Sequence, residues 1–451
     1  MSFEKWKTLI LSILVSLSLL LTLAIWNYQP NFAPANSDQA IEAQLNGQTQ
    51  TKKQTIFPTQ IIYHLNNGDP LGLVDKQEEK SLYEQMQNWS IFDFTTTDID
   101  YEEHLENNQN KLEVIFPTEL PNNLLTDLFT VEDEFIPEGN FNRMLISLEE
   151  NNSQEENIQI LFAKGQTGTA IQANIQNYGE VVTFLQNYEE QHEMVSYEMM
   201  KNSEDMNMYL PREVNLSSYL YSYQELEVQR FIDFLFKNPS AVKRFYIDDG
   251  SLTYSDGIRE LKTTGNRVNF ANPVNASSDE GKTLNDYDLL DQVHNDFMNS
   301  HLGFTATDPF HYVLTDLSNT PTMNMVRYTL KFQGYPVYEN QTLTTISVEW
   351  HNQAVYKYTH PQIKLSDSRG PKQSATDLFK TSTVVSALKN GSNYENNLIY
   401  DVAIGYKVEE QSGDQVFKLT PTWYVKGSNG WSEFRLPEEM AGGDNNAMGT
   451  N

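Results

Sequence analysis

The amino-acid sequence predicts an α+β protein in which a single N-terminal transmembrane helix precedes an extracytoplasmic, multi-domain region of helices packed on antiparallel meander sheets. Three observations lead to this fold class. An uncharged apolar run occupies residues 9–26, short alternating segments bounded by turn residues recur, and amphipathic helical patterns are twice followed by such segments. At 451 residues the chain is long enough for about three domains, and its 24 tyrosines and 23 phenylalanines indicate packed cores.

The apolar run from Leu9 to Trp26 is close to the roughly 20 residues that a membrane-spanning helix needs. Lys5 and Lys7 precede it, and the cytoplasmic flanks of such helices are enriched in lysine and arginine. We therefore expect a single-pass protein of the cell membrane, with residues 1–8 in the cytoplasm, a transmembrane helix over 9–28 and the bulk of the chain extracytoplasmic.

A cleavable signal peptide is the competing interpretation, because Ala33-Pro34-Ala35 has the small-residue form of a cleavage site. The apolar run is longer than the usual core of a signal peptide, and several residues separate Trp26 from that site. These lengths favour a retained anchor.

Small hydroxyl residues recur inside the apolar run. Ser12 and Ser16 are four residues apart, and so are Ser18 and Thr22. Small residues at this spacing let a second helix approach closely, and their hydroxyls can bond across the contact. We predict that these four residues bind partner helices. The alternative, that each hydroxyl bonds the backbone of its own helix, stays open.

Composition and turn signals divide the rest of the chain. Residues 29–55 are rich in Gln, Asn and Thr, lack hydrophobic periodicity and are typical of a flexible stalk. Three α+β domains are expected after it, over 56–205, 206–280 and 281–436. The tail over 437–451 is rich in Gly and Asn, and we expect it to be disordered.

The first domain shows strand and helix patterns in turn. Its expected strands are 56–64, 111–116, 143–148 and 158–163, and its expected helices are 79–87 and 181–199. In the second domain Ser222 to Glu225 has the form of a capping box, which predicts a helix that ends before Pro239. A meander is expected to follow, with turns at Asp249-Gly250, Asp256-Gly257 and Gly265-Asn266.

The third domain repeats this plan. A helix is expected to start near Thr283, followed by strands and by a second helix that stops at Asn390-Gly391. The expected strands are 325–332, 343–350, 354–360, 398–408 and 415–425, and the second helix is 375–389. A helix followed by a meander, found twice, predicts that the later domains are similar to each other.

Charge and cysteine content exclude several classes of function. The formal net charge is −30, and so acidic a surface repels nucleic acid. The chain has no cysteine, which rules out disulfides, thiolate metal sites and cysteine nucleophiles. We therefore expect no nucleic-acid partner.

No catalytic template is complete. His192-Glu193 begins like a zincin motif, but Ser196 stands where the second histidine ligand is required. Ala276 to Thr283 fits the loose P-loop pattern, but Asp279 and Glu280 would face the phosphates. The eight histidines show no metal-ligand spacing. We expect no catalytic, metal-binding or cofactor-binding residue, no cofactor and no enzyme activity.

Seven segments together resemble the YycH family. Each is short, but their order and spacing match over nearly the whole chain, from the apolar run to about Phe434. They are Ser12 to Pro30, Gln60 to His64, Asn140 to Arg143, Gly334 to Val337, Val348 to Trp350, Ala403 to Tyr406 and Pro421 to Val425.

The resemblance implies a non-enzymatic, membrane-anchored regulator. YycH-like proteins associate with a sensor histidine kinase of the WalK (YycG) type and with a YycI-like membrane protein, and they modulate two-component signalling that controls cell-wall metabolism. It also implies that the domain over 281–436 is YycI-like. The strong acidity and the Gly/Asn-rich tail depart from the family pattern. The alternative function is an extracytoplasmic cell-wall-active enzyme or a wall-fragment sensor.

Overall fold

The computed structural model divides the chain into two compact units, residues 1–43 and 44–451. In the first unit it describes Lys7, Leu14, Val15 and Ser18, all of which are helical and exposed. In the second it describes residues 44–65, 68–106, 110–149, 159–165, 167–247, 251–275, 284–320, 323–338, 343–369, 373–375, 378–390, 398–411 and 415–437.

The expected transmembrane helix over 9–28 falls almost wholly outside these described residues. Within the described part of the chain, no helix has the length and apolarity to cross a membrane. The membrane anchor therefore stays a prediction. The same holds for the partner-binding assignment of Ser12, Ser16 and Thr22, which lie outside the described residues, and of Ser18.

The first part of the folded unit, which we call the first lobe, is a ten-stranded sheet with its helices. The described pairs are antiparallel except for β3 with β5. In sheet order the strands are β10 (Asn207–Pro211), β9 (Met194–Lys201), β2 (Leu71–Leu73), β1 (Gln60–His64), β4 (Lys111–Pro121), β6 (Asn140–Ser147), β7 (Ile160–Ala163), β8 (Thr167–Ile175), β3 (Ser90–Asp100) and β5 (Thr130–Val131).

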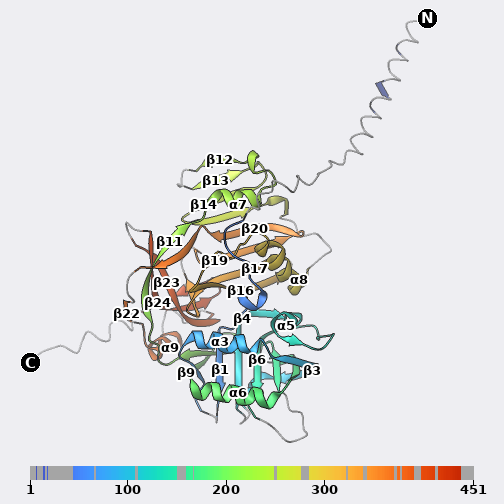
Figure 1. Cartoon of the computed structure of the whole chain (residues 1–451). Helices are drawn as coiled ribbons and strands as arrows, with labels where there is room; N and C mark the ends of the chain where they lie inside the picture. Colours follow the sequence, from blue (N-terminus) through green and yellow to red (C-terminus); the bar gives the residue numbers. More distant parts are fainter. Residues whose placement is uncertain are drawn as a thin grey trace, which may run out of the picture. The chain divides into compact units, whose positions relative to one another are not determined.

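Helices pack on this sheet because each presents one apolar face. α3 (Lys76–Met86) buries Leu82, Tyr83 and Met86, and α6 (Tyr178–Gln191) lies across the strands (Figure 1). The hydroxyl of Tyr63 on β1 donates to the carbonyl of Leu185 on α6 at 3.3 Å. The shorter helices of this lobe are α4 (Tyr101–Glu106), η1 (Asn122–Leu124) and α5 (Leu125–Leu128).

The second lobe is built on a 15-stranded sheet in which β18 pairs with β23 in parallel and the other described pairs are antiparallel. β16 (Phe310–Thr320) pairs with β17, β22 (Gln373–Ala375) with β11 and β25 (Gly430–Glu433) with β24. The main path is β12 (Lys243–Tyr246), β13 (Leu252–Ser255), β14 (Glu260–Thr264), β15 (Arg267–Ala271), β20 (Ala354–Pro361), β19 (Thr345–His351), β17 (Met323–Phe332), β18 (Tyr335–Tyr338), β23 (Asp401–Glu410), β24 (Val416–Gly427), β11 (Ser217–Glu225) and β21 (Ile363–Ser368).

The helices of the second lobe follow the same rule of one buried face. α7 (Val228–Leu235) buries Phe231 and Ile232. α8 (Asp286–Asp291) continues into the π-helix η4 (Gln292–Asn299). The remaining helices are η2 (Pro239–Ala241), η3 (Pro273–Asn275) and α9 (Thr381–Asn390).

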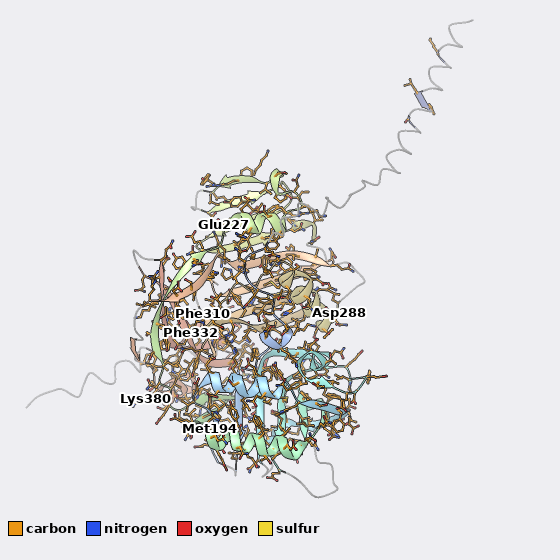
Figure 2. All side chains as sticks on the ribbon, viewed as in Figure 1. Met194, Glu227, Asp288, Phe310, Phe332 and Lys380 are labelled. Atoms are coloured by element: carbon orange, nitrogen blue, oxygen red, sulfur yellow. The ribbon has the colours of Figure 1, made fainter. Side chains whose placement is uncertain are left out.

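One large hydrophobic core contains residues of both lobes. Two of its members, Phe310 and Phe332, are directly opposite on β16 and β17, with ring centroids 5.0 Å apart (Figure 2). The α+β fold class and the antiparallel character of the sheets are thereby confirmed. The domain boundaries at 205/206 and 280/281, and the similarity of the later domains, stay predictions.

Most expected strands are present, and so is the helix-then-meander order, since α7 precedes β12–β15 and α8 precedes β16–β20. The turns at Asp256-Gly257 and Gly265-Asn266 connect antiparallel neighbours as predicted. The turn at Asp249-Gly250 and the loop Ala276 to Thr283 lie outside the described residues. So does the tail after Pro437.

Three local predictions are wrong. The helix expected over 181–199 ends at Gln191, because Met194–Lys201 is drawn into the sheet between β10 and β2. The supposed capping box at Ser222 to Glu225 lies in β11, between β24 and β21, and the helix begins after Glu227. The last long helix begins at Thr381 rather than 375.

Candidate functional site

The chain joins the folded unit through residues 44–58, which we call the junction segment. Its backbone N–H groups at Leu45, Gly47 and Gln48 donate to carbonyl oxygens in residues 301–304 of the second lobe, at 2.9, 3.2 and 3.0 Å. A Cβ atom at position 47 would overlap the carbonyl oxygens of that strand-like partner, so only glycine fits there. Main-chain hydrogen bonds therefore hold this segment against the second lobe.

The π-helix η4 holds the next residue of the junction segment. Asn299 accepts from the N–H of Gln50 at 2.9 Å and donates to its carbonyl at 2.9 Å. His294 Nε2 lies 2.7 Å from the same carbonyl, and Nδ1 lies 3.0 Å from the hydroxyl of Tyr328. Burial lowers the pKa of His294 to about 4, so the ring is neutral at pH 7. Because a carbonyl can only accept, Nε2 carries the proton and Nδ1 accepts from Tyr328.

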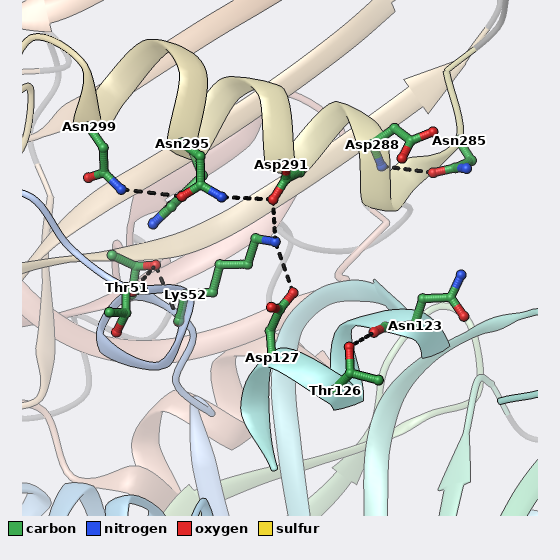
Figure 3. Close-up of polar contacts among 12 residues, drawn as sticks. Thr51, Lys52, Asn123, Thr126, Asp127, Asn285, Asp288, Asp291, Asn295 and Asn299 are labelled. Carbon is green, nitrogen blue, oxygen red and sulfur yellow. Dashed lines mark hydrogen bonds and ion pairs between the residues drawn. The ribbon is translucent and has the colours of Figure 1, made fainter. Parts of the chain in front are cut away.

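Lys52 then joins the two lobes (Figure 3). Its ammonium lies 2.9 Å from Asp127 on α5 of the first lobe and 2.6 Å from Asp291 on α8 of the second. The side chain is 6% exposed, and the ammonium also lies 4.5 Å from the ring centre of Tyr287. Burial alone would lower the pKa of Lys52, but the hydrogen bonds to the two carboxylates raise it. The ammonium therefore stays charged and links three parts of the chain.

The junction segment overlaps the stalk expected over 29–55. Over residues 44–55 the structure has a bound and partly helical chain, with α2 over Lys52–Thr55. Leu45 and Ile56 are buried in the large core. Isolated apolar residues of this kind give no periodic signal, which is why the sequence predicts a flexible segment here.

A second contact between the lobes is made by the turn after β17. Gly334 has φ +82°, and a Cβ at this position would lie 2.5 Å from Cβ of Lys76 on α3. The glycine therefore lets the second lobe approach the start of α3. Nearby, the Leu317 N–H donates to the Thr118 hydroxyl at 3.2 Å.

Between these contacts lies a cavity with a volume of about 570 Å³, which is in the range of small-molecule sites. The first lobe contributes residues of β1, β4, β6, β9 and β10, and the second contributes residues of β16, β17, β18, β23, β24 and β25. Its polar and aromatic lining includes Lys76, Arg143, Asn207, Lys331, Tyr338 and Trp431.

A buried carboxylate holds Arg143 in the wall of this cavity. Glu113 on β4 is fully buried, forms an ion pair with Arg143, and accepts from Tyr209 at 2.7 Å and Tyr101 at 3.1 Å. His64 Nε2 lies 2.9 Å from Oε2 of Glu113, the oxygen that also accepts from Tyr209. Burial would raise the pKa of Glu113, but the charge of Arg143 and these hydrogen bonds lower it to about 2. With every lone pair engaged, Glu113 is a structural anion.

The cavity gathers segments that lie far apart in the sequence. Five of the seven segments quoted for the family resemblance place residues in its lining, namely Gln60, Asn142 with Arg143, Gly334 to Pro336, Ala403 with Ile404, and Trp423. Lys331 and Asn207 were not singled out from the sequence, since a lone lysine or asparagine on a strand carries no motif. Among the described residues no group of three metal-ligating side chains occurs.

Comparison with known proteins assigns the chain to a family. Residues 4–190 match the family model described as YycH protein, N-terminal domain, and residues 205–439 match YycH protein, C-terminal domain. The chain is 20% identical over 448 residues to the two-component system WalR/WalK regulatory protein YycH of Bacillus subtilis (strain 168), covering 94% of this chain and 95% of that protein.

A solved structure has the same fold. The crystal structure of YycH from Bacillus subtilis matches with a TM-score of 0.64 at 17% identity, over 86% of this chain and 98% of that one. The family models together cover far more than half of the residues. The chain therefore belongs to the YycH family.

Proposed function

We propose that this protein is a non-enzymatic, membrane-anchored regulator that binds a WalK-like sensor histidine kinase together with a YycI-like membrane protein and modulates two-component signalling that controls cell-wall metabolism. The observation that carries the proposal is the match over nearly the full length of a relative named as a regulatory protein of the WalR/WalK system. Its localisation is the cell membrane, with the N-terminus cytoplasmic and the bulk extracytoplasmic.

The apolar run offers two faces for two partners. An α-helix turns about 100° per residue, so the pair Ser12 and Ser16 is centred about 120° away from the pair Ser18 and Thr22. Each pair has the spacing that lets a second helix approach closely. One face would bind the kinase helix and the other the YycI-like helix.

The junction segment supports a mechanical connection between such helices and the folded unit. A shift of the chain before residue 44 acts on the hydrogen bonds of residues 45–50 to the second lobe and on Lys52, which contacts both lobes. A partner that binds one arrangement of the helices better than another thereby changes the populations of the two arrangements.

The test is site-specific crosslinking in intact cells. The chain has no native cysteine, so single cysteines can be placed at Ser12, Ser18 and Leu17 and the crosslinked partners identified by mass. Cysteines at 12 and 18 are expected to capture different partners. Leu17 is the matched control, because it lies on the helix side opposite to both pairs.

Two results would contradict the proposal. The first is crosslinking at Leu17 as strong as at the serines, which would mean that the hydroxyl faces are not selected. The second is a mature protein that starts after residue 35 and is recovered without detergent, because such a protein has no anchor.

A further inference from the structure

The cavity between the lobes contains a buried cation that lacks a carboxylate partner. Lys331 on β17 is 7% exposed, and its ammonium donates to the carbonyl of Pro58 at 3.4 Å, a long hydrogen bond. Among the described residues no carboxylate lies within ion-pair distance of it. Two other cations in the lining are paired, the buried Arg143 with Glu113 and the half-buried Lys76 with Glu79. A buried charge without a partner is costly, so such charges usually mark a function.

Three further polar atoms in the lining are also unsatisfied. Oδ1 of Asn142, Oδ1 of Asn207 and Nε of Arg143 are buried and have no hydrogen-bond partner among the described residues. All three residues line the cavity, and Asn207 and Arg143 are each 6% exposed. Buried polar atoms are nearly always hydrogen-bonded, so one donor and two acceptors left over in one cavity point to a polar occupant.

The charge distribution of the lining selects an anion. The chain has 61 acidic and 31 basic residues, yet among the described residues the buried charge of the lining without an ion-pair partner is the ammonium of Lys331. Glu204 and Glu213, which also line the cavity, are exposed. Asp401 lies by Tyr338 in another part of the lining, where burial raises its pKa and so favours the neutral form. Burial lowers the pKa of Lys331 to about 8, so its ammonium is mostly charged at pH 7.

Another part of the lining suits an apolar or aromatic group. Tyr338 and Trp431 are half-buried, and their ring centroids lie 5.2 Å apart. Ile404 and Trp423 also line the cavity and are buried. Aromatic walls with a few placed polar groups are typical of small-molecule sites.

We propose that this cavity binds a small molecule in which an anionic oxygen group, a carboxylate or a phosphate, is joined to a partly apolar body. The anion replaces Pro58 as the acceptor of the Lys331 ammonium, and the body lies against Tyr338 and Trp431. Pro58 ends the junction segment, so ligand binding releases one of the contacts that hold this segment. The proposed binding follows from the cavity alone. An effect of the ligand on signalling, in contrast, depends on the proposed regulatory function.

The test uses the full-length chain in lipid nanodiscs and three probes. Two are anionic, 4-phenylbutyrate and phenyl phosphate, and the third is the neutral 4-phenylbutanamide. Binding is measured by calorimetry and by the fluorescence of Trp423 and Trp431, two of the six tryptophans. At least one anionic probe is expected to bind at concentrations of about 5 mM or below, and the neutral amide about tenfold more weakly. The tighter anionic probe distinguishes a carboxylate ligand from a phosphate ligand.

The variants are chosen to separate charge from shape. Lys331→Met keeps the length of the side chain and should weaken the anionic probe about tenfold, whereas Lys331→Arg should retain it. Lys164→Met is the matched control, because Lys164 is an exposed lysine outside the lining. Should Lys331→Met not fold, wild-type protein still gives a readout, because binding near pH 8 must take up a proton on Lys331, visible in buffers of different ionisation enthalpy.

Three results would overturn the proposal: no anionic probe binds, the neutral amide binds equally well, or Lys331→Met binds like the wild type. None of these measurements involves a kinase. Failure of ligand binding is therefore distinguishable from failure of the proposed regulatory function, which the crosslinking experiment tests separately.

Discussion

The ammonium nitrogen of Lys52 lies 2.6 Å from Oδ1 of Asp291, across the boundary between the junction segment and the second lobe. The same nitrogen lies 2.9 Å from Asp127 of the first lobe (Figure 3). One side chain, located where the chain passes from the N-terminal unit to the folded unit, thus contacts both halves of the folded unit. Its removal should affect the junction more than the lobes themselves.

Lys52→Met is expected to lower the free energy of unfolding by about 1–3 kcal/mol, because the carboxylates of Asp127 and Asp291 lose their shared counter-charge. Water still reaches both carboxylates in part, which limits the loss. Asp127 and Asp291 are 31% and 39% exposed, which keeps the cost below that of a fully buried pair. Hydrogen exchange at residues 45–50 should accelerate. Chemical denaturation and mass-resolved exchange provide the two measurements.

Lys164→Met is the control for this substitution. Lys164 and Glu119 form an exposed pair at 2.7 Å, with 51% and 43% exposure, and such pairs contribute roughly 0–1 kcal/mol. If both variants lose equal stability, or if exchange at 45–50 is unchanged in Lys52→Met, the bridging role assigned to Lys52 is wrong.

Arg143→Met should be far more destabilising, by about 3–5 kcal/mol, because it leaves the carboxylate of Glu113 buried without its counter-charge. The double variant Arg143→Met with Glu113→Gln should recover much of this loss, since neither charge then remains. Urea denaturation of the wild type, the two single variants Arg143→Met and Glu113→Gln, and the double variant measures the coupling. Additive losses would mean that the pair is not a unit.

The same carboxylate predicts an acid-dependent loss of stability. The folded pKa of Glu113 is lowered to about 2 from an unfolded value near 4.5, so its contribution is fully present above pH 4.5 and is lost as the pH falls toward 2. The difference in unfolding free energy between the wild type and the double variant should shrink by about 3 kcal/mol over that range. A constant difference would show that Glu113 is not ionised in the fold.

Buried histidines predict a second acid effect, which begins at higher pH and is larger. Burial lowers the pKa of His294 and His360 to about 4 and that of His301 and His311 to about 3. Each neutral ring contributes stability above pH 6.5, which is lost as the pH falls toward the folded pKa, because only the unfolded chain takes up the proton. The loss is about 1.4 kcal/mol per ring for each pH unit well below 6.5. Histidine NMR titrations should show at least four rings that stay neutral at pH 5.5.

Much of this fold is predictable from the sequence because its strands alternate and its turns carry Gly, Asn and Asp. The errors have a common physical cause. Met194–Lys201 has apolar residues that fit a continued helix, but partners on both sides, β10 and β2, satisfy its backbone as a strand. Ser222 and Glu225 have cap spacing, yet pairing with β24 and β21 decides their conformation. Distant partners overrode local preference.

The candidate site was less predictable than the fold. The junction segment is bound through main-chain groups and through Lys52, none of which leaves a periodic pattern. The cavity combines Arg143 of β6, Lys331 of β17 and Trp423 of β24, which only the folded chain brings together. The sequence did give one indication of the site. The segments that resemble the YycH family are dispersed along the chain, as expected when distant segments form one site.

Gly334→Ala is expected to cost about 2 kcal/mol or more, because a Cβ would lie 2.5 Å from Cβ of Lys76 in addition to straining a residue at φ +82°. Gly430→Ala separates the two effects. Gly430 has φ +92° with no atom within 4 Å of the added Cβ, so its cost is backbone strain alone, about 1 kcal/mol. Equal losses in the two variants would exclude a close contact between the turn and α3.

Asn299 provides the most direct test of the junction segment, because its amide binds both backbone groups of Gln50. Asn299→Asp keeps an acceptor for the Gln50 N–H but places a charge against the carbonyl of the same residue, while Asn299→Ala removes both hydrogen bonds. Hydrogen exchange at residues 45–50 should therefore accelerate in both variants, and the rest of the second lobe should be unchanged. Gln411→Ala is the control, since the Gln411 amide follows β23 and donates to the carbonyl of Glu409 at 3.3 Å.

The signalling readout of these three variants then connects structure with the proposed function. If the junction segment transmits changes from the chain before residue 44 to the lobes, Asn299→Ala should alter kinase-dependent transcription in cells at unchanged protein level, and Gln411→Ala should not. Accelerated exchange without any change in signalling would mean that the hydrogen bonds of Gln50 hold the segment in place but carry no signal. Coupling would then have to pass through the other contacts of this segment, namely Lys52 with Asp291 and the main-chain hydrogen bonds of residues 45–48 to residues 301–304.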